Sequence, residues 1–181
     1  MLLPSGNDAA YILAAEVGRR LDGDPNEGAW YAVETFMEEV NGRARALGMT
    51  GTHFVNPDGI HSDNHYMTPR DLVTMARLAL EIPEVVAYAT TPKDTVTFVS
   101  GEEMEWKNTN ALVHEESPYY CPYAVGLKTG QTPYAGSCLL SAFRVEGRTL
   151  IIGVFGCPEI DDRFEDTLQL FTDAVKALDI G

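Results

Sequence analysis

The sequence predicts an α+β domain in which helices come first and an antiparallel sheet and a final helix follow. Before residue 94, apolar residues recur at steps of three and four, which is typical of helices. Beyond it they alternate or form β-rich runs, and helical spacing returns at the end. We expect one partial domain over residues 1–181, with a helical part at about 1–93, a sheet part at about 94–157 and a C-terminal helix at about 161–178.

Three helices are expected in the helical part, at about 8–18, 29–47 and 69–82. Gly18 and Gly48 are interpreted as the residues that end the first two, because glycine readily adopts the left-handed conformation that follows a helix. Thr68 and Pro69 suit the start of the third, with threonine as the cap and proline at the first helical position. Pro83 is expected to stop it.

Strands are expected at 95–99, 124–132, 137–145 and 148–155, and residues 108–110 are expected to form a polar turn. Glu146 and Gly147 separate the last two runs and indicate a hairpin. Both hairpin runs are apolar almost throughout, and such strands are stable only when both faces are covered. We therefore expect further structure to cover this sheet.

Composition excludes several classes of function. The net charge of −14 and the pI near 4.5 argue against nucleic acid or an anionic membrane surface as a partner. The cysteines (Cys121, Cys138, Cys157) and the four histidines lack the spacing of metal ligands, so no metal and no cofactor are expected. The first residues also lack the basic and apolar segments of a signal peptide.

Two short motifs carry the chemistry: Ser5-Gly6-Asn7 and Lys128-Thr129-Gly130. Each is weak alone, because Ser5 or Asn7 would also serve as a helix cap and the second motif could be a turn. Together, in this order, they match two of the three motifs of serine β-lactamases and penicillin-binding proteins.

The residue types of these motifs suit acyl transfer. A serine hydroxyl beside a lysine can relay protons to a leaving amine, and an asparagine amide can hold both the lysine and the substrate. Lysine charge and a threonine hydroxyl can bind a substrate carboxylate. Glycine lets substrate approach the strand, and a backbone N–H just beyond can stabilise an oxyanion.

The chain also resembles the serine-type D-Ala-D-Ala carboxypeptidases, the low-molecular-weight penicillin-binding proteins, over nearly its whole length. The similar segments are PSGNDAAYILAAEVG, NGRARALGMTGTHFVNPDGIHSDNHYMTPRDLVTMARLAL, KNTNALV and VGLKTGQTPYAGSCLLSAFRVEGRTLIIGVFG. The resemblance implies the penicillin-binding-protein/β-lactamase-like transpeptidase fold, an antiparallel sheet flanked by helices. It also implies an extracytoplasmic enzyme that removes the terminal D-alanine from peptidoglycan pentapeptides and is inhibited by β-lactams.

The resemblance further implies roles for single residues. Ser5 matches the proton-relay serine, Asn7 the asparagine of the same motif, and Lys128 the lysine beside Ser5 and the substrate carboxylate. Thr129 and Gly130 match the strand that binds the peptide. The backbone N–H of Gln131 matches an oxyanion donor.

One motif of the family is absent. No serine among the 181 residues is followed three places on by lysine, and Thr90 has that spacing to Lys93 only across Pro92, which disrupts the helical turn. We expect the chain to lack the first two strands and the nucleophile helix, and to be inactive alone. We also expect self-association through the uncovered sheet edge.

Three alternatives remain. The chain could be a non-catalytic homologue that binds peptidoglycan stem peptides. A serine β-lactamase is disfavoured, because glycine stands between Ser5 and Asn7 and no Glu-x-x-Leu-Asn motif lies between Asn7 and Lys128. A purely structural interpretation, with a cap and a turn, leaves the matching segments unexplained.

Overall fold

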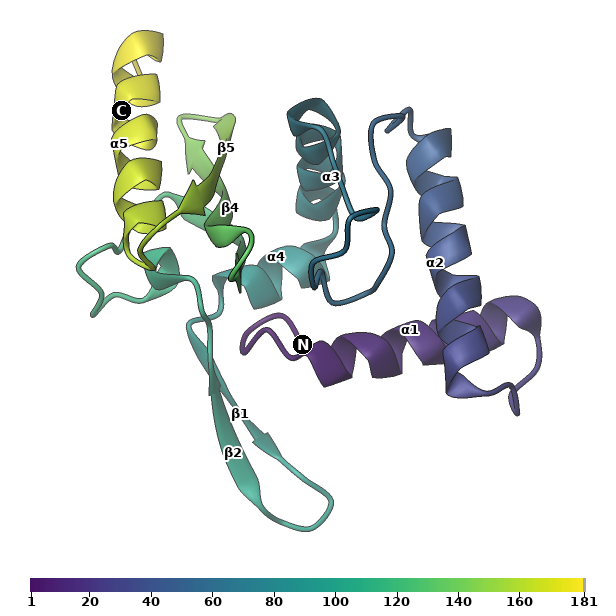
Figure 1. The fold of residues 1–181 in the computed structure, drawn as a ribbon. Helices are drawn as coiled ribbons and strands as arrows, with labels where there is room; N and C mark the ends of the chain where they lie inside the picture. The colour runs from purple at the N-terminus through teal and green to yellow at the C-terminus, as the bar shows by residue number, and fades with distance from the viewer. Residues whose placement is uncertain (181) are drawn as a thin grey trace. The chain divides into compact units, whose positions relative to one another are not determined.

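The computed structural model describes residues 1–180, which form two compact units. The first unit comprises residues 6–77 together with Met1, and the second comprises residues 2–5 and the chain from residue 78 onward. Figure 1 shows the order of the helices and strands. No helix among the described residues is both long and apolar enough to cross a membrane. That the chain forms one partial catalytic domain stays a prediction.

The first unit is helical. It contains α1 (Asn7–Asp22), α2 (Ala29–Ala46) and, up to Arg77, α3 (Pro69–Glu81). The predicted end of α1 at Gly18 is wrong, because the helix continues to Asp22 and turns at Gly23, whose φ is 81°. Gly18 is instead where α2 comes close: a Cβ there would overlap the backbone of Ala32. The glycine therefore permits helix packing rather than ending the helix.

The start of α3 follows the sequence prediction. The Asp71 backbone N–H donates to the Thr68 hydroxyl at 3.2 Å, so Thr68 caps the helix that begins at Pro69. The Asp71 carboxylate, which is buried, accepts from the backbone N–H of Gly51 and the hydroxyl of Thr52, both at 2.8 Å. These bonds tie the preceding loop to the helix.

The second unit holds the sheets. Its elements are α4 (Pro83–Thr90), β1 (Lys93–Thr97), β2 (Glu103–Lys107), the 3-10 helix η1 (Ala111–Val113), β3 (Ala124–Thr132), β4 (Gly136–Val145), β5 (Arg148–Cys157) and α5 (Asp162–Leu178). β1 and β2 form a two-stranded ribbon that projects from the rest of the unit (Figure 1). β3, β4 and β5 form an antiparallel sheet in that order.

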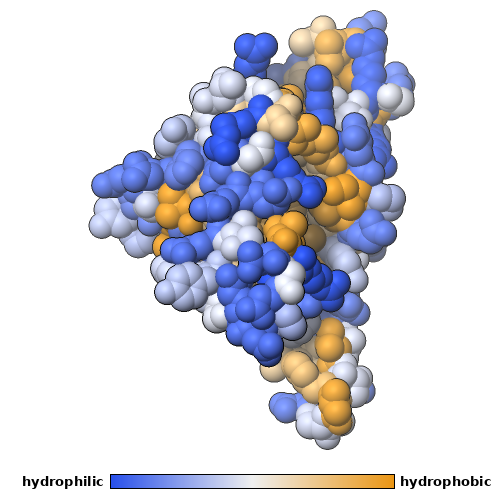
Figure 2. Space-filling view, turned by 90° about the vertical axis from the view of Figure 1, so that its right-hand side faces the viewer, coloured by the Kyte–Doolittle hydropathy of each residue, from blue (hydrophilic) through white to orange (hydrophobic). Residues whose placement is uncertain are grey.

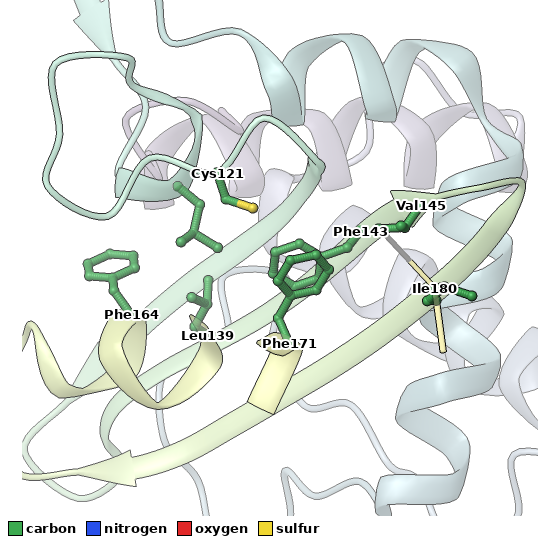
Figure 3. Packing of buried hydrophobic residues seen from close by; sticks show 8 residues of the cluster. Cys121, Leu139, Phe143, Val145, Phe164, Phe171 and Ile180 are labelled. Atoms are coloured by element: carbon green, nitrogen blue, oxygen red, sulfur yellow. The ribbon is translucent and has the colours of Figure 1, made fainter. Parts of the chain in front are cut away.

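The core of the second unit lies between this sheet and α5. Leu112, Leu139 and Phe143 are fully buried, and the rings of Phe143 and Phe171 stack with centroids 4.3 Å apart (Figure 3). α5 contacts β4 and β5, while α4 packs against β3. Of the apolar face predicted for the final helix, Leu178 is 42% exposed, whereas the other four residues pack on this core: Phe164, Leu168, Phe171 and Val175.

Predictions for the other elements had mixed outcomes. The strand at 124–132 and the hairpin are confirmed, and both Glu146 (φ 47°) and Gly147 (φ 75°) have the positive φ of a tight hairpin turn. The strand expected at 95–99 lies at Lys93–Thr97. Three elements were missed: α4, β2 and the short η1. α4 begins with Pro83 itself, since proline is tolerated in a first helical turn, and β2 is rich in glutamate, which is uncommon in strands.

β5 is an edge strand of the described sheet, because it pairs only with β4. Its apolar residues are incompletely covered: Ile151 and Ile152 are half-buried and Phe155 is 55% exposed. The self-association expected through this edge stays a prediction.

Candidate active site

Two segments that are far apart in the sequence meet in the second unit. The Lys128 ammonium, on β3, donates to the Ser5 hydroxyl at 2.8 Å and to the Thr129 carbonyl at 2.8 Å. Ser5 and Lys128 come from the two motifs that the sequence singled out. Their contact places a hydroxyl and an amine within proton-transfer distance.

The loop at residues 2–5 holds the Ser5 hydroxyl in place. Leu3 is buried, and its carbonyl accepts from the Thr109 backbone N–H at 3.1 Å. Ser5 has φ of 58°, in the left-handed region that residues other than glycine rarely adopt. Such a conformation persists only where surrounding contacts fix it, and it is common at functional sites.

The second motif lies inside a strand. Lys128, Thr129 and Gly130 belong to β3, where they pair with Leu140, Leu139 and Cys138 of β4. The interpretation of this motif as a turn is therefore wrong. β3 pairs only with β4, so its other edge is unpaired within the described sheet, and an extended peptide could bind there.

The side chains of the motif differ in exposure along this strand. Thr129 is buried and Lys128 half-buried, whereas Gly130 and Gln131 are exposed. Gly130 and Gln131 are thus the most accessible of these four residues.

A second cation, missed in the sequence, lies near Lys128. Arg163, in the first turn of α5, is buried, and its guanidinium donates to the Gly130 carbonyl at 3.3 Å. It also lies over the Phe164 ring, 4.8 Å from the centroid. In the sequence, Arg163 is a single arginine that follows Asp162 at the start of the expected helix. Single arginines are common on solvated helices, so this one gave no sign of a role in the site.

Burial changes the electrostatics of both cations. Desolvation, followed by repulsion from Arg163, lowers the pKa of Lys128 from 10.5 to about 8. Desolvation also lowers the pKa of Arg163. A lysine with a pKa near 8 can both donate and accept a proton near neutral pH.

Asn7 is placed differently from Ser5. It is the first residue of α1, in the first unit, with an exposed side chain. Gly6 occupies the cap position of α1, and no side chain donates or accepts a capping hydrogen bond there. The interpretation of Ser5 or Asn7 as a helix cap is therefore wrong.

Within residues 1–180, no group of three or more histidine, cysteine, aspartate or glutamate side chains could hold a metal ion. The three cysteines are free thiols, two of them buried.

Comparisons with known proteins identify the family of this chain. Residues 1–159 match the family model described as D-alanyl-D-alanine carboxypeptidase. A D-alanyl-D-alanine carboxypeptidase of Streptomyces sp. (strain K15) is 35% identical over 177 residues, which are 94% of this chain and 56% of that protein. The chain thus spans about half the length of this relative.

Solved structures show the same fold. The crystal structure of the Streptomyces K15 DD-transpeptidase matches with a TM-score of 0.81 and 32% identity, over 94% of this chain and 63% of that one. Penicillin-binding protein D2 of Listeria monocytogenes, solved in its cefotaxime-bound form, matches with a TM-score of 0.72 and 32% identity, over 95% and 62%. The predicted α+β fold of penicillin-binding proteins is confirmed.

Proposed function

Because this chain belongs to the D-alanyl-D-alanine carboxypeptidase family, we propose that it forms part of a serine-type D-Ala-D-Ala carboxypeptidase. The complete enzyme would remove the terminal D-alanine from peptidoglycan pentapeptides through an acyl-enzyme. Its place of action would be the cell envelope, outside the cytoplasm. This chain would supply the groups that bind the peptide and relay protons.

The observation that carries this proposal is the 2.8 Å hydrogen bond between Lys128 and Ser5. With its pKa lowered to about 8, a fraction of Lys128 is neutral near neutral pH, and the neutral amine can accept a proton from the neighbouring Ser5 hydroxyl. Ser5 can then pass a proton to the amine that leaves when the peptide bond breaks. That Asn7 binds the peptide amide through its side chain, which both donates and accepts, stays a prediction, because Asn7 belongs to the first unit.

The terminal carboxylate of the peptide would bind beside β3. Lys128 and Arg163 provide positive charge there, and the Thr129 hydroxyl provides a donor. Gly130 has no side chain to block the backbone, so the peptide can align along the unpaired edge of β3. The Gln131 N–H would stabilise the oxyanion.

The nucleophile is not evident in these 181 residues, because none of the serines is followed three places on by lysine. We therefore expect this chain alone to bind the peptide without becoming acylated. β-Lactams, which mimic the peptide, would acylate the complete enzyme.

Peptide binding tests the proposal. The chain is titrated with a tripeptide that ends in D-Ala-D-Ala, and with a control that ends in L-Ala-L-Ala, by isothermal calorimetry. We expect binding of the first peptide only, and loss of at least about tenfold in affinity in Lys128→Met, which removes a charged hydrogen-bond donor. Equal binding of both peptides would overturn the proposal.

Ser5→Gly provides a matched control for the relay. Glycine accepts the positive φ of Ser5 without strain, so this variant removes the hydroxymethyl group and leaves the backbone conformation accessible. We expect it to bind the D-Ala-D-Ala peptide nearly as well as wild type, because Ser5 acts on the leaving amine and not on the carboxylate.

Incubation with benzylpenicillin, followed by intact-mass measurement, should show no adduct on the folded chain. An adduct would reveal a nucleophile outside the expected motif.

A further inference from the structure

Thr109 contacts both segments of the candidate site. Its hydroxyl lies 2.5 Å from the Thr129 hydroxyl, and its backbone N–H donates to the Leu3 carbonyl at 3.1 Å. The first bond reaches the strand that carries Lys128, and the second reaches the loop that presents Ser5. Nothing in the sequence distinguished Thr109 from the two asparagines of its expected turn.

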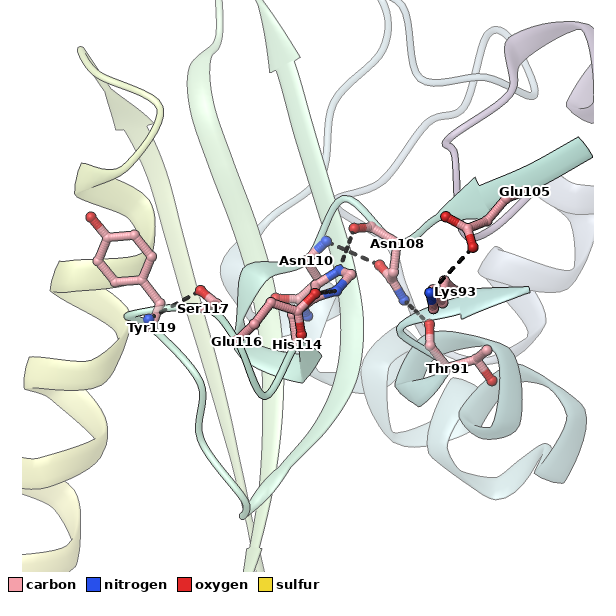
Figure 4. A network of polar contacts seen from close by, with 9 residues as sticks. All are labelled: Thr91, Lys93, Glu105, Asn108, Asn110, His114, Glu116, Ser117 and Tyr119. Carbon is pink, nitrogen blue, oxygen red and sulfur yellow. Dashed lines mark hydrogen bonds and ion pairs between the residues drawn. The ribbon is translucent and has the colours of Figure 1, made fainter. Parts of the chain in front are cut away.

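The two neighbours of Thr109 fix its position. Asn108 and Asn110 are buried, whereas Thr109 between them is exposed. The Asn108 side chain donates to the carbonyl of Ala89 at 3.1 Å. It also donates to the carbonyl of Thr91 and accepts from the Asn110 N–H, both at 3.0 Å (Figure 4).

The network continues through Asn110 and His114. The Asn110 side chain accepts from the Leu112 N–H at 3.1 Å, and the His114 ring lies 2.7 Å from the Asn108 carbonyl. These bonds fix the backbone on both sides of Thr109, which places its exposed hydroxyl against Thr129.

The direction of the hydroxyl bond determines what Thr129 can do. Each hydroxyl has one hydrogen to donate. If Thr129 donated to Thr109, it would have no hydrogen left for a ligand. If Thr109 donates, the Thr129 oxygen is satisfied and its hydrogen can point to an anion.

We propose that Thr109 is a positioning residue that donates to Thr129, so that Thr129 in turn donates to the terminal carboxylate of the bound peptide. This inference rests on the proposed function, because it concerns the same peptide. Thr109 itself does not touch the peptide. Its effect should therefore depend on the charge of the peptide terminus.

The experiment compares two peptides on three proteins. The D-Ala-D-Ala tripeptide is used with a free carboxylate and with a terminal amide, and the ratio of their dissociation constants is the readout. Thr109→Val removes the hydroxyl at nearly constant volume, and Thr109→Ser keeps it; both leave the backbone bond to Leu3 intact. We expect the preference for the carboxylate to fall about tenfold in Thr109→Val and to return in Thr109→Ser.

The outcomes separate this inference from the proposed function. If wild type shows no preference for the carboxylate, both are wrong. If wild type shows it and Thr109→Val keeps it, only the role of Thr109 is wrong. If Thr109 had a merely structural role, Thr109→Val would weaken the binding of both peptides equally and leave the ratio of their dissociation constants unchanged. That result also overturns the inference. Circular dichroism checks folding, and Thr109→Ala replaces Thr109→Val if valine is not accommodated.

Discussion

The two units bury their apolar residues in opposite ways. In the second unit, large side chains such as Leu139 and Phe143 are fully buried against α5. In the first unit, most of the buried apolar residues are alanines, while large ones such as Ile12 (68% exposed) and Trp30 (70%) lie at the surface. Figure 2 shows apolar residues exposed among polar ones on one face of the molecule.

Most of the candidate site lies in the unit with the aromatic core. Ser5, Lys128, Thr109 and Thr129 all belong to the unit with the aromatic core. The first unit, which carries Asn7, packs α1 and α2 through small residues and therefore gains less from burial per side chain. Substitutions in the two units should consequently change the free energy of unfolding by different amounts.

Phe143→Ala should have the largest effect. The ring is fully buried and stacks on Phe171, so its removal leaves a cavity between β4 and α5 and should lower the free energy of unfolding by about 3–5 kcal/mol. Urea denaturation followed by far-UV circular dichroism measures this loss. Phe155→Ala is the control, since that ring is 55% exposed, and its cost should be well below that of Phe143→Ala. Equal losses of stability in the two variants would mean that the core position Phe143 and the edge position Phe155 are buried to the same degree.

Gly18→Ala should have the next largest effect and tests the first unit. Its methyl group would meet the Ala32 backbone, so α1 and α2 must separate, at a cost of about 1–3 kcal/mol. Gly42→Ala is the matched control in α2, because no atom lies within 4 Å of the added Cβ. That variant should instead gain about 0.5–1 kcal/mol from helix propensity. Thermal unfolding of both variants measures the two changes in stability. If both variants were destabilised, the close approach at Gly18 would not explain its loss.

The outcome at Gly18 also illustrates what the sequence could predict. Patterns of local spacing located most helices and the hairpin, since these depend on nearby residues. A glycine that ends a helix and one that admits a second helix look the same in one sequence, because the difference lies in the distant Ala32. β2 was missed for a similar reason, as its pairing with β1 is not visible in its own composition.

The candidate site shows the same limit. Ser5 and Lys128 were predicted together because two motifs matched a known set. Arg163 and Thr109 were not, since each acts through a contact with a residue distant in the sequence, Gly130 and Thr129 respectively. Chemistry that resides in a motif can be predicted, whereas the residues that position it become evident only in three dimensions.

The charge of Lys128 should produce a smaller, pH-dependent effect in the second unit. Its folded-state pKa is about 8, against an ordinary value of 10.5. Below the folded-state pKa both states hold the proton, and folding carries the full cost of desolvating the ammonium. Between the two values the unfolded state binds more protons, so the free energy of unfolding rises with pH.

Lys128→Met isolates this contribution from other groups that titrate in the same range. As the pH rises from about 8 to about 10.5, the stability of wild type should increase relative to the variant. Urea denaturation of both proteins across this range measures the difference. A constant difference would mean that Lys128 is not desolvated in the folded chain.

Ile12→Ser should have the smallest effect, although it removes a large apolar side chain from a helix. Ile12 is 68% exposed, and isoleucine and serine have similar helix propensities, so the free energy of unfolding should change by no more than about 0.5 kcal/mol. Ala14→Ser, two residues further along α1, adds a single oxygen to a side chain that is 1% exposed, and should cost about 1–3 kcal/mol. Thermal unfolding of the two variants should show a larger loss of stability for Ala14→Ser than for Ile12→Ser. The reverse order would mean that Ile12 is buried in solution, and that the first unit has an apolar core of the same kind as the second.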